Sequence, residues 1–280
     1  MPLKINYSKI NTNKLISNLV LFCNDKFKLK ELNKYFSKDD FSYINDLLKS
    51  HDLKKNLLTF ELSSKKKIVL VSIKDNLKSS DVENLGAEFF KLISSAKKSE
   101  YSIISDSVLK NQSNFLGHFL HGLKLKSYVF DKYKSKKEIK FITINVIGNK
   151  NKPSSKEQIK FKALEEGTFF ARDLVSEPGN VLHPDEYAKR IKSLKKDGLK
   201  INIYDEKKLK KLGMHALLGV GQGSIRGSYL VTMEWRGAND NSKPLAFVGK
   251  GVCFDTGGYS LKPARFMEDM TYDMAGSATV

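Results

Sequence analysis

Two lysines and an aspartate lie close together in the segment Gly249–Pro263, which also contains four glycines. Lys250 and Asp255 follow the apolar run Leu245–Val248, and Lys262 follows a glycine pair. A glycine-rich loop with a lysine is typical of phosphate binding, but neither lysine has the spacing of a P-loop, in which the lysine is followed by Ser or Thr. The residues alone leave three interpretations open: nucleotide binding, solvated lysines with an aspartate in a turn, and a metal site.

A metal site would use each of these side chains. The carboxylate of Asp255 supplies oxygen ligands and could bridge two cations, which suits zinc, manganese or magnesium. A lysine at the end of a buried strand is partly desolvated, so we expect the pKa of Lys250 to be lowered and its neutral amine to be a possible ligand. Lys262 could keep its charge and polarise a substrate carbonyl near the metals.

Asp273 is a further candidate ligand, eleven residues beyond Lys262. It lies among small and apolar residues, where an unpaired charge would be costly. The alternative is that Asp273 caps the N-terminus of a helix over residues 275–280, which is an ordinary role for aspartate. Spacing does not decide between a ligand and a cap, so both stay open.

The elements that must position these side chains alternate between strands and helices. In the first 150 residues, short apolar and β-branched runs predict strands over residues 57–62, 68–73, 101–104 and 141–147. Helical spacing predicts one helix that begins near Ser80 and another whose apolar face contains Phe115, Leu116, Phe119 and Leu120. This alternation predicts an α/β fold with a largely parallel or mixed sheet.

A polar, turn-rich break over residues 148–155 precedes the second half of the chain. The pattern there predicts helices over 156–176, 185–194 and 207–212, and strands over 201–204, 229–235 and 245–248. We therefore expect an N-terminal α/β domain over residues 1–152 and the beginning of a second α/β domain over residues 153–280.

Composition limits the classes of function. The net charge of +18 would suit a nucleic-acid partner, but arginine, which nucleic-acid sites favour, is absent before Arg172, and the lysines stand in short solvated runs. No run approaches the ~18 apolar residues of a membrane helix, and the apolar run Leu15–Phe22 has no signal-peptide cleavage site. The two cysteines, Cys23 and Cys253, are far apart in the sequence, which fits a reducing compartment. We expect a cytoplasmic protein without membrane contact.

The segment Val248–Gly258, followed by Lys262-Pro263 and by Met267–Asp273, closely resembles the signature of the leucyl (cytosol) aminopeptidases, peptidase family M17. Residues 171–182, and residues 217–224 together with 234–237, resemble the entry to that family's catalytic domain and the segment that follows it. The resemblance is specific from about residue 165 to 280 and general over residues 1–150. It implies that the second domain is the start of a mixed-sheet α/β metallopeptidase domain.

The resemblance also implies roles for single residues in a leucyl aminopeptidase, which releases N-terminal residues from peptides with two divalent ions, Mn²⁺ or Zn²⁺. Lys250 and Asp273 would bind the same metal, and Asp255 would bridge both. Lys262 would be the catalytic lysine at the scissile carbonyl, which a metal-activated water attacks. Cys253 is interpreted as a packed thiol and not a nucleophile, because no histidine lies near it in the sequence.

The family has a further acidic motif, of the type NTDAEGR, which this sequence does not contain. The resemblance therefore implies the front part of a longer protein, which would form a homohexamer when complete. We expect the 280 residues alone to lack peptidase activity and to bind metal weakly. Two rivals remain: a basic module that binds nucleic acid through residues 1–150, and a non-catalytic relative with a degraded site. His118 and His121, one helical turn apart, are assigned to core or surface roles in the first domain.

Overall fold

The computed structural model describes residues 3–9, 18–64, 66–95, 98–109, 114–137, 140–238 and 242–280. The chain divides into two compact units, residues 1–167 and 168–280, so the division falls inside one long helix. Within the described ranges, no helix is both long enough and apolar enough to cross a membrane.

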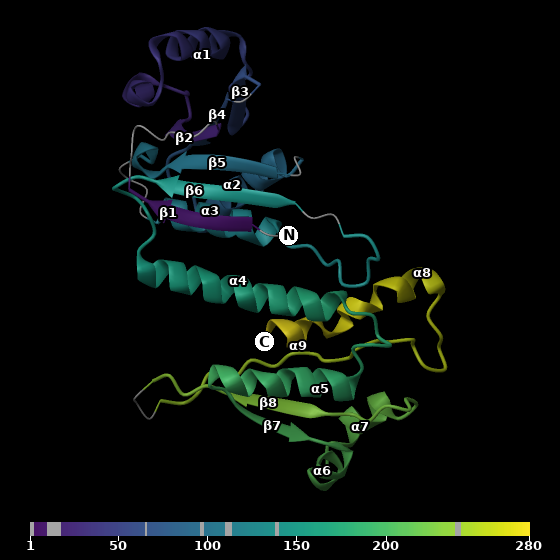
Figure 1. Ribbon diagram of the computed structural model, residues 1–280. Helices are drawn as coiled ribbons and strands as arrows, with labels where there is room; N and C mark the ends of the chain where they lie inside the picture. The colour runs from purple at the N-terminus through teal and green to yellow at the C-terminus, as the bar shows by residue number, and fades with distance from the viewer. Residues whose placement is uncertain are drawn as a thin grey trace. The chain divides into compact units, whose positions relative to one another are not determined.

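The N-terminal unit is built on a six-stranded mixed sheet with the strand order β1-β6-β5-β2-β4-β3 (Figure 1). All neighbouring strands pair in parallel except β3, which runs antiparallel to β4. Parallel strands are buried on both faces, which explains the continuous apolar runs that predict them. The strands are β1 (Leu3–Ser8), β2 (Asn18–Asn24), β3 (Leu57–Ser63), β4 (Lys66–Ile73), β5 (Lys98–Ile104) and β6 (Phe141–Ile147).

The four strands predicted in this unit are confirmed as β3 to β6, whereas β1 and β2 were not predicted as strands. Residues 18–22 of the apolar run Leu15–Phe22 lie in β2, and the first three residues of the run lie outside the described part of the chain. The α/β class and the mixed sheet are therefore as predicted.

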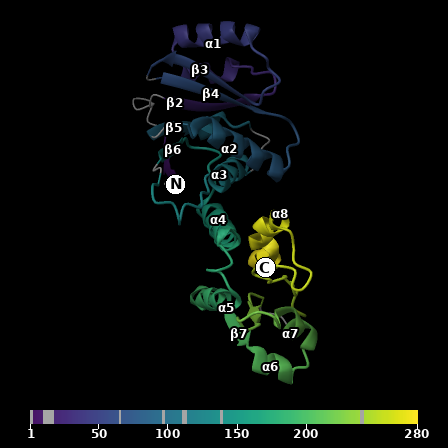
Figure 2. The same ribbon diagram turned by 90° about the vertical axis from the view of Figure 1, so that its right-hand side faces the viewer.

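Helices cover both faces of this sheet (Figure 2). α2 (Ser79–Ile93) and α3 (Phe115–Lys126) pack on one face, where Phe22, Phe89 and Phe119 are fully buried. α1 (Lys38–Ser50) packs on the other face with the apolar side chains of β2 and β4 that point that way. The predicted apolar face of α3 is confirmed, because all four of its residues are buried. The described part of this unit also contains the 3-10 turns η2 (Lys30–Tyr35) and η3 (Ser105–Ser107).

The C-terminal unit contains a two-stranded antiparallel sheet and several short helices (Figure 1). α4 runs through the division between the units and contributes Leu174 to the second core, which also holds Tyr187, Cys253 and Met274. The elements are α4 (Ser155–Ser176), α5 (Pro184–Lys192), η4 (Ser193–Asp197), β7 (Lys200–Tyr204), α6 (Glu206–Lys211), α7 (His215–Gly221), β8 (Leu230–Glu234), α8 (Ala264–Met267), η5 (Glu268–Met274) and α9 (Ala275–Thr279).

The predicted strand over residues 245–248 is wrong. The backbone there is not in a strand, and the side chains of Leu245, Phe247 and Val248 are exposed. A strand requires a paired neighbour, and in the described part of the chain β7 and β8 pair only with each other. The apolar composition of residues 245–248 is compatible with a strand. It carries no information on whether a partner strand is present.

Candidate metal centre

Lys250 and Asp273 form an ion pair in the C-terminal unit. Lys250 Nζ donates to Asp273 Oδ1 at 2.6 Å; the lysine side chain is 60% exposed, but that of the aspartate is only 15% exposed. This hydrogen bond raises the pKa of Lys250 above its usual value. The other carboxylate oxygen, Asp273 Oδ2, is buried and has no hydrogen-bond partner. Because an unpartnered buried carboxylate oxygen is costly, this atom is suited to contact a cation.

Asp255 and Lys262 form a second ion pair. Lys262 Nζ donates to Asp255 Oδ2 at 2.7 Å, and the backbone N–H of Gly257 donates to Asp255 Oδ1 at 2.8 Å. The hydrogen bond from Lys262, followed by that from Gly257, holds the pKa of Asp255 below its usual value. Asp255 is thus both a turn residue and the partner of a lysine.

The turn between Asp255 and Lys262 depends on two glycines in the left-handed conformation. The φ angle is 91° at Gly257 and 71° at Gly258, a region that other residues rarely adopt. The backbone N–H of Lys262 donates to Thr256 O at 2.9 Å and closes the turn. The predicted positive-φ turn is confirmed, and it brings Lys262 back to Asp255.

One expectation about this site is wrong, and one alternative is ruled out. The pKa of Lys250 is raised instead of lowered, because its side chain is exposed and hydrogen-bonded to Asp273 and not desolvated at a strand end. Asp273 does not cap a helix: α9 follows Met274 and has no side-chain cap. The carboxylate of Asp273 is therefore committed to Lys250 and not to helix backbone.

The loop that carries Lys250 lies directly against α9. A Cβ at Gly249 would overlap the backbone of Ser277, and a Cβ at Gly276 would lie 3.3 Å from the backbone nitrogen of Lys250. The Ser277 N–H donates to the carbonyl oxygen of Lys250 at 3.0 Å. Glycine at position 249 is required for this close approach of two backbones. Sequence reasoning missed Ser277. The signal that could have found it is the pair of glycines, Gly249 and Gly276, which lie next to Lys250 and Ser277.

The four residues predicted to act in metal binding or catalysis lie close to one another in two ion pairs. Lys250 interacts electrostatically with Asp255 as well as with Asp273, so the two ion pairs share one region of the unit. Two carboxylates and an amine are donors that suit Mn²⁺ or Zn²⁺. Among the residues that the structure describes, however, no group of three His, Cys, Asp or Glu side chains is arranged to hold a metal ion. The described residues therefore do not form a complete metal site by themselves.

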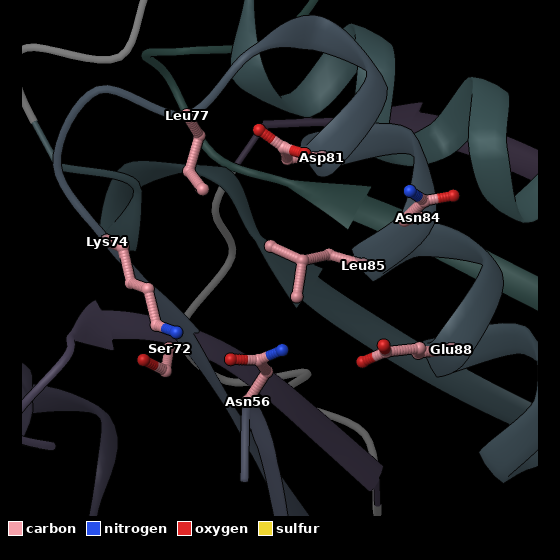
Figure 3. Close-up of a pocket in the computed structure, with 8 residues that line it drawn as sticks. All are labelled: Asn56, Ser72, Lys74, Leu77, Asp81, Asn84, Leu85 and Glu88. Carbon is pink, nitrogen blue, oxygen red and sulfur yellow. The ribbon is translucent and has the colours of Figure 1, made fainter. Parts of the chain in front are cut away.

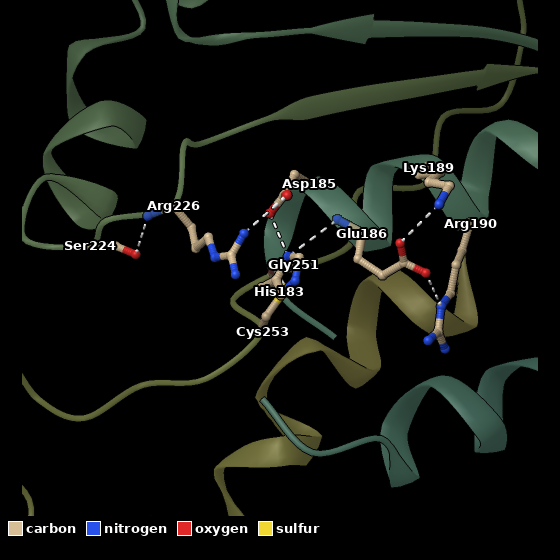
Figure 4. Close-up of polar contacts among 9 residues, drawn as sticks. All are labelled: His183, Asp185, Glu186, Lys189, Arg190, Ser224, Arg226, Gly251 and Cys253. Atoms are coloured by element: carbon tan, nitrogen blue, oxygen red, sulfur yellow. Dashed lines mark hydrogen bonds and ion pairs between the residues drawn. The ribbon is translucent and has the colours of Figure 1, made fainter. Parts of the chain in front are cut away.

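Polar contacts join the residues of the first turns of α5 to one another and to Arg226, which donates to Asp185 Oδ2 at 3.4 Å (Figure 4). Arg190 Nη1 donates to Glu177 Oε1, which is buried, at 2.9 Å, and Arg190 Nε donates to Glu186 Oε1 at 3.0 Å. This network fixes the segment before α5, where a Cβ at Gly179 would meet the ring of Phe254. Two segments that carry the resemblance therefore pack against each other.

Two family models match this chain. Residues 20–137 match the N-terminal domain of the cytosol aminopeptidase family, and residues 169–280 match its catalytic domain. The chain belongs to the cytosol aminopeptidase family. It is 45% identical over 192 residues to a probable cytosol aminopeptidase of Phytoplasma australiense, a match that covers 66% of this chain and 38% of that relative. The chain spans less than half the length of the curated family members that it matches.

Solved structures share the fold of this family member. A mutant of tomato leucine aminopeptidase matches with a TM-score of 0.74 at 22% identity, covering 99% of this chain and 58% of the other. The bottromycin maturation enzyme BotP, in complex with Mn, matches with a TM-score of 0.69 at 20% identity, covering 94% and 54%. These likenesses concern the fold.

The cysteine of the family signature is a packed thiol in this chain, as the sequence predicts. Cys253 is buried in the core of the C-terminal unit with Tyr187 and Met274. Burial raises the pKa of the Cys253 thiol to about 11, so the thiolate is scarce near neutral pH. Cys253 therefore contributes packing to the loop that carries Lys250 and Asp255.

The two histidines lie in the part that matches the family's N-terminal domain. His118 Nδ1 and His121 Nδ1 lie 3.1 Å and 3.0 Å from the same oxygen, Glu83 Oε1. The ring of Phe161 packs against both imidazoles. Sequence reasoning paired the histidines through their spacing but missed Glu83, which lies on a different helix.

The N-terminal unit has a polar hollow of about 260 Å³ near the carboxyl end of β4 (Figure 3). Its walls come from β4, from the loop that follows, from α2 and from the residue before β3. The lining residues are Asn56, Ser72, Lys74, Leu77, Asp81, Asn84, Leu85 and Glu88. None of the four residues predicted to act in catalysis or metal binding lines this hollow.

Proposed function

We propose that this chain is the part of a metal-dependent aminopeptidase that holds the first ligands of a dinuclear site and its catalytic lysine. Its substrates would be peptides with a free N-terminus, leucine-type above all. Membership of the cytosol aminopeptidase family supports the reaction class. The observation that carries the proposal is the unpartnered, buried Oδ2 of Asp273 beside Lys250.

Lys250 and Asp273 would hold one divalent ion, Mn²⁺ or Zn²⁺, and Asp255 would lie between two. Such ions supply a Lewis acid for the scissile carbonyl and lower the pKa of water. The exposed Lys250 and the half-exposed Asp255 present their donor atoms to solvent, where an ion and a peptide can reach them. The buried half of the Asp273 carboxylate would orient the first ion.

Lys262 would place its ammonium group on the carbonyl oxygen of the substrate. Its Nζ is held by Asp255 and lies 3.2 Å from the sulfur of Met270. A carboxylate that binds metal ions is a weaker hydrogen-bond acceptor for a lysine, because the metal ions withdraw electron density from its oxygens. Filling the site would therefore weaken the bond between Asp255 and Lys262 and let the lysine turn to substrate.

Metal binding can be tested on the 280-residue chain by titration with Mn²⁺, followed by electron paramagnetic resonance. We expect weak, saturable binding that Asp255→Asn and Asp273→Asn each reduce at least tenfold. Asp269→Asn is the matched control, because Asp269 is exposed and lies in η5 with Asp273. Equal binding by all four proteins would rule the site out.

Catalysis can be tested on the protein expressed from its complete reading frame. With Mn²⁺ and leucyl-p-nitroanilide, Lys262→Met should lower kcat by a factor of about 10² or more, with a smaller change in KM. Lys243→Met, at an exposed residue, controls for loss of charge. An unchanged kcat would remove Lys262 from the mechanism.

Assembly and location form a further part of the proposal. The resemblance favours a homohexamer, and the word cytosol in the relatives' names favours a cytosolic protein. Sedimentation of the complete protein would measure the first, and cell fractionation the second. A monomer at micromolar concentration would contradict the hexamer.

A further inference from the structure

We propose that Tyr187 and Ser277 form a positioning pair that fixes the loop of Lys250 against the segment of Asp273. This proposal rests on the proposed metal site, because its consequence is the geometry of that site. Neither residue would touch substrate or metal. They would act through the backbone of Lys250.

Hydrogen bonds connect the pair to the site in an unbroken sequence. Tyr187 Oη and Ser277 Oγ lie 3.0 Å apart, and the Ser277 N–H donates to Lys250 O at 3.0 Å. Lys250 Nζ then donates to Asp273 Oδ1 at 2.6 Å. The tyrosine is therefore two residues removed from the carboxylate whose second oxygen lacks a partner.

The direction of each bond can be deduced from the protons available. Ser277 Oγ also lies 2.8 Å from the carbonyl oxygen of Met274, which can only accept. A serine hydroxyl has a single proton, so that proton goes to Met274 and the Tyr187 O–H must donate to Ser277. Each of the three groups thus has a fixed role, and the arrangement leaves no alternative orientation of the two hydroxyls.

The surroundings give this pair little freedom to move. Tyr187 is 5% exposed and belongs to the core that also contains Cys253 and Met274. Cys253 follows Lys250 by three residues and Met274 follows Asp273 directly. On the other side of Ser277, a Cβ at Gly249 would overlap its backbone. Ser277 is therefore confined between a buried tyrosine and the loop that carries a proposed ligand.

Tyr187→Phe tests the pair with the smallest change, because it removes one hydroxyl and keeps the buried ring. In hydrogen exchange read out by NMR, the Ser277 amide should exchange at least about fivefold faster, as expected when one buried hydrogen bond is lost. Amides of β7 and β8 should keep their rates. Tyr204→Phe is the matched control, since Tyr204 lies in β7 and away from this network.

Ser277→Ala removes the other hydroxyl of the pair. It keeps the proposal testable if Tyr187→Phe does not fold. Thr279→Ala controls for it, because Thr279 Oγ1 bonds a carbonyl within α9, that of Ala275, at 2.8 Å. In Mn²⁺ titrations of the full chain, Tyr187→Phe and Ser277→Ala should each weaken binding about five- to tenfold. The double variant should lose little more than Ser277→Ala alone, because Ser277→Ala already removes the bond from Tyr187 together with the bond to Met274.

The possible results separate this proposal from the one on which it rests. Faster exchange together with weaker Mn²⁺ binding supports the positioning pair. If the unsubstituted chain binds Mn²⁺ but the tyrosine and serine variants bind it within twofold of the same affinity, the pair does not position the site. An unchanged Ser277 exchange rate also overturns it. If the unsubstituted chain shows no saturable binding, the proposed metal site fails and the positioning role fails with it.

Discussion

The carboxylate of Asp273 has two unlike oxygens: one accepts a 2.6 Å hydrogen bond from Lys250, and the other is buried without any partner. Lysine alone therefore satisfies only half of this group. A buried carboxylate oxygen without a hydrogen-bond partner is costly, so its presence in a fold calls for a functional reason. The nearby amine and carboxylate groups of Lys250 and Asp255 favour cation binding as that reason.

Metal affinity should rise with pH. To act as a nitrogen ligand, Lys250 must lose a proton, and its bond to Asp273 raises the pKa of Lys250 and so makes that loss harder. We expect the Mn²⁺ affinity of the chain to increase by up to about tenfold per pH unit between pH 6 and 8, one proton being released per ion. Calorimetric titrations in buffers of different ionisation enthalpy would count the proton. Lys250→Ala should bind more weakly and release no such proton, and an unchanged proton count in that variant would contradict the assignment.

Gly249→Ala should destabilise the C-terminal unit by about 1–3 kcal/mol, because the new methyl group overlaps the backbone of Ser277. Gly251→Ala is a close control: its Cβ would lie 3.4 Å from Ser277 Oγ, an ordinary contact. Urea unfolding of the two variants measures the difference. Equal stabilities would show that the loop and α9 do not touch in solution as they do here.

Glu83→Gln should lower the stability of the N-terminal unit by about 1 kcal/mol at pH 7, since Glu83 Oε1 is shared by His118 and His121. Burial acts to raise the pKa of Glu83, but the hydrogen bonds from His121 and His118 outweigh it, and the pKa is lowered. The stabilisation is therefore present above the ordinary glutamate pKa of about 4.3 and is lost as the pH falls through the lower, folded value.

Chemical denaturation at several pH values measures this effect, and the difference between Glu83→Gln and the unsubstituted chain should vanish near pH 3. Glu88→Gln, at an exposed position on the same helix, should show little effect at any pH. A deficit of Glu83→Gln that persists at low pH would mean that packing and not charge makes this contact.

Both thiols should resist labelling in the folded chain. Burial raises the pKa of Cys23 to about 12 and that of Cys253 to about 11. Reaction with iodoacetamide at pH 8 should therefore be slower than in urea-unfolded chain by a factor of 10² or more, roughly the loss of thiolate. Mass spectrometry of labelled peptides reports each thiol separately. Rapid labelling of Cys253 under native conditions would contradict its assignment as a packed residue.

Local sequence patterns predicted most of the strands and helices of the N-terminal unit. The strands β3 to β6 and the face of α3 followed from apolar runs and helical spacing. For the parallel strand β4, burial on both faces of the sheet leaves a continuous apolar signal. The run 245–248 has the same signal and is not a strand, since pairing depends on residues far away in the sequence. Apolar composition shows that a segment is able to form a strand, but a strand forms only where another strand is available to pair with it.

The candidate site shows the same division. The resemblance supplied Lys250, Asp255, Lys262 and Asp273, and the glycine turn that returns Lys262 to Asp255 was visible in the sequence. Tyr187 could not be found in this way, because its hydroxyl acts across 90 residues on Ser277. The pKa of Lys250 was predicted in the wrong direction for a related reason: its counterion is 23 residues further along the chain.

The two ion pairs have a consequence for how ions would arrive. The formal charges of Lys250, Lys262, Asp255 and Asp273 cancel, so these four groups present no net negative field at long range. An arriving metal ion would bind carboxylate oxygens whose charge is already neutralised by the ammonium groups of Lys250 and Lys262. Metal binding would then replace an ammonium group by a metal ion at each carboxylate. The rate of metal entry should then depend only weakly on ionic strength, unlike that of a site built from carboxylates alone.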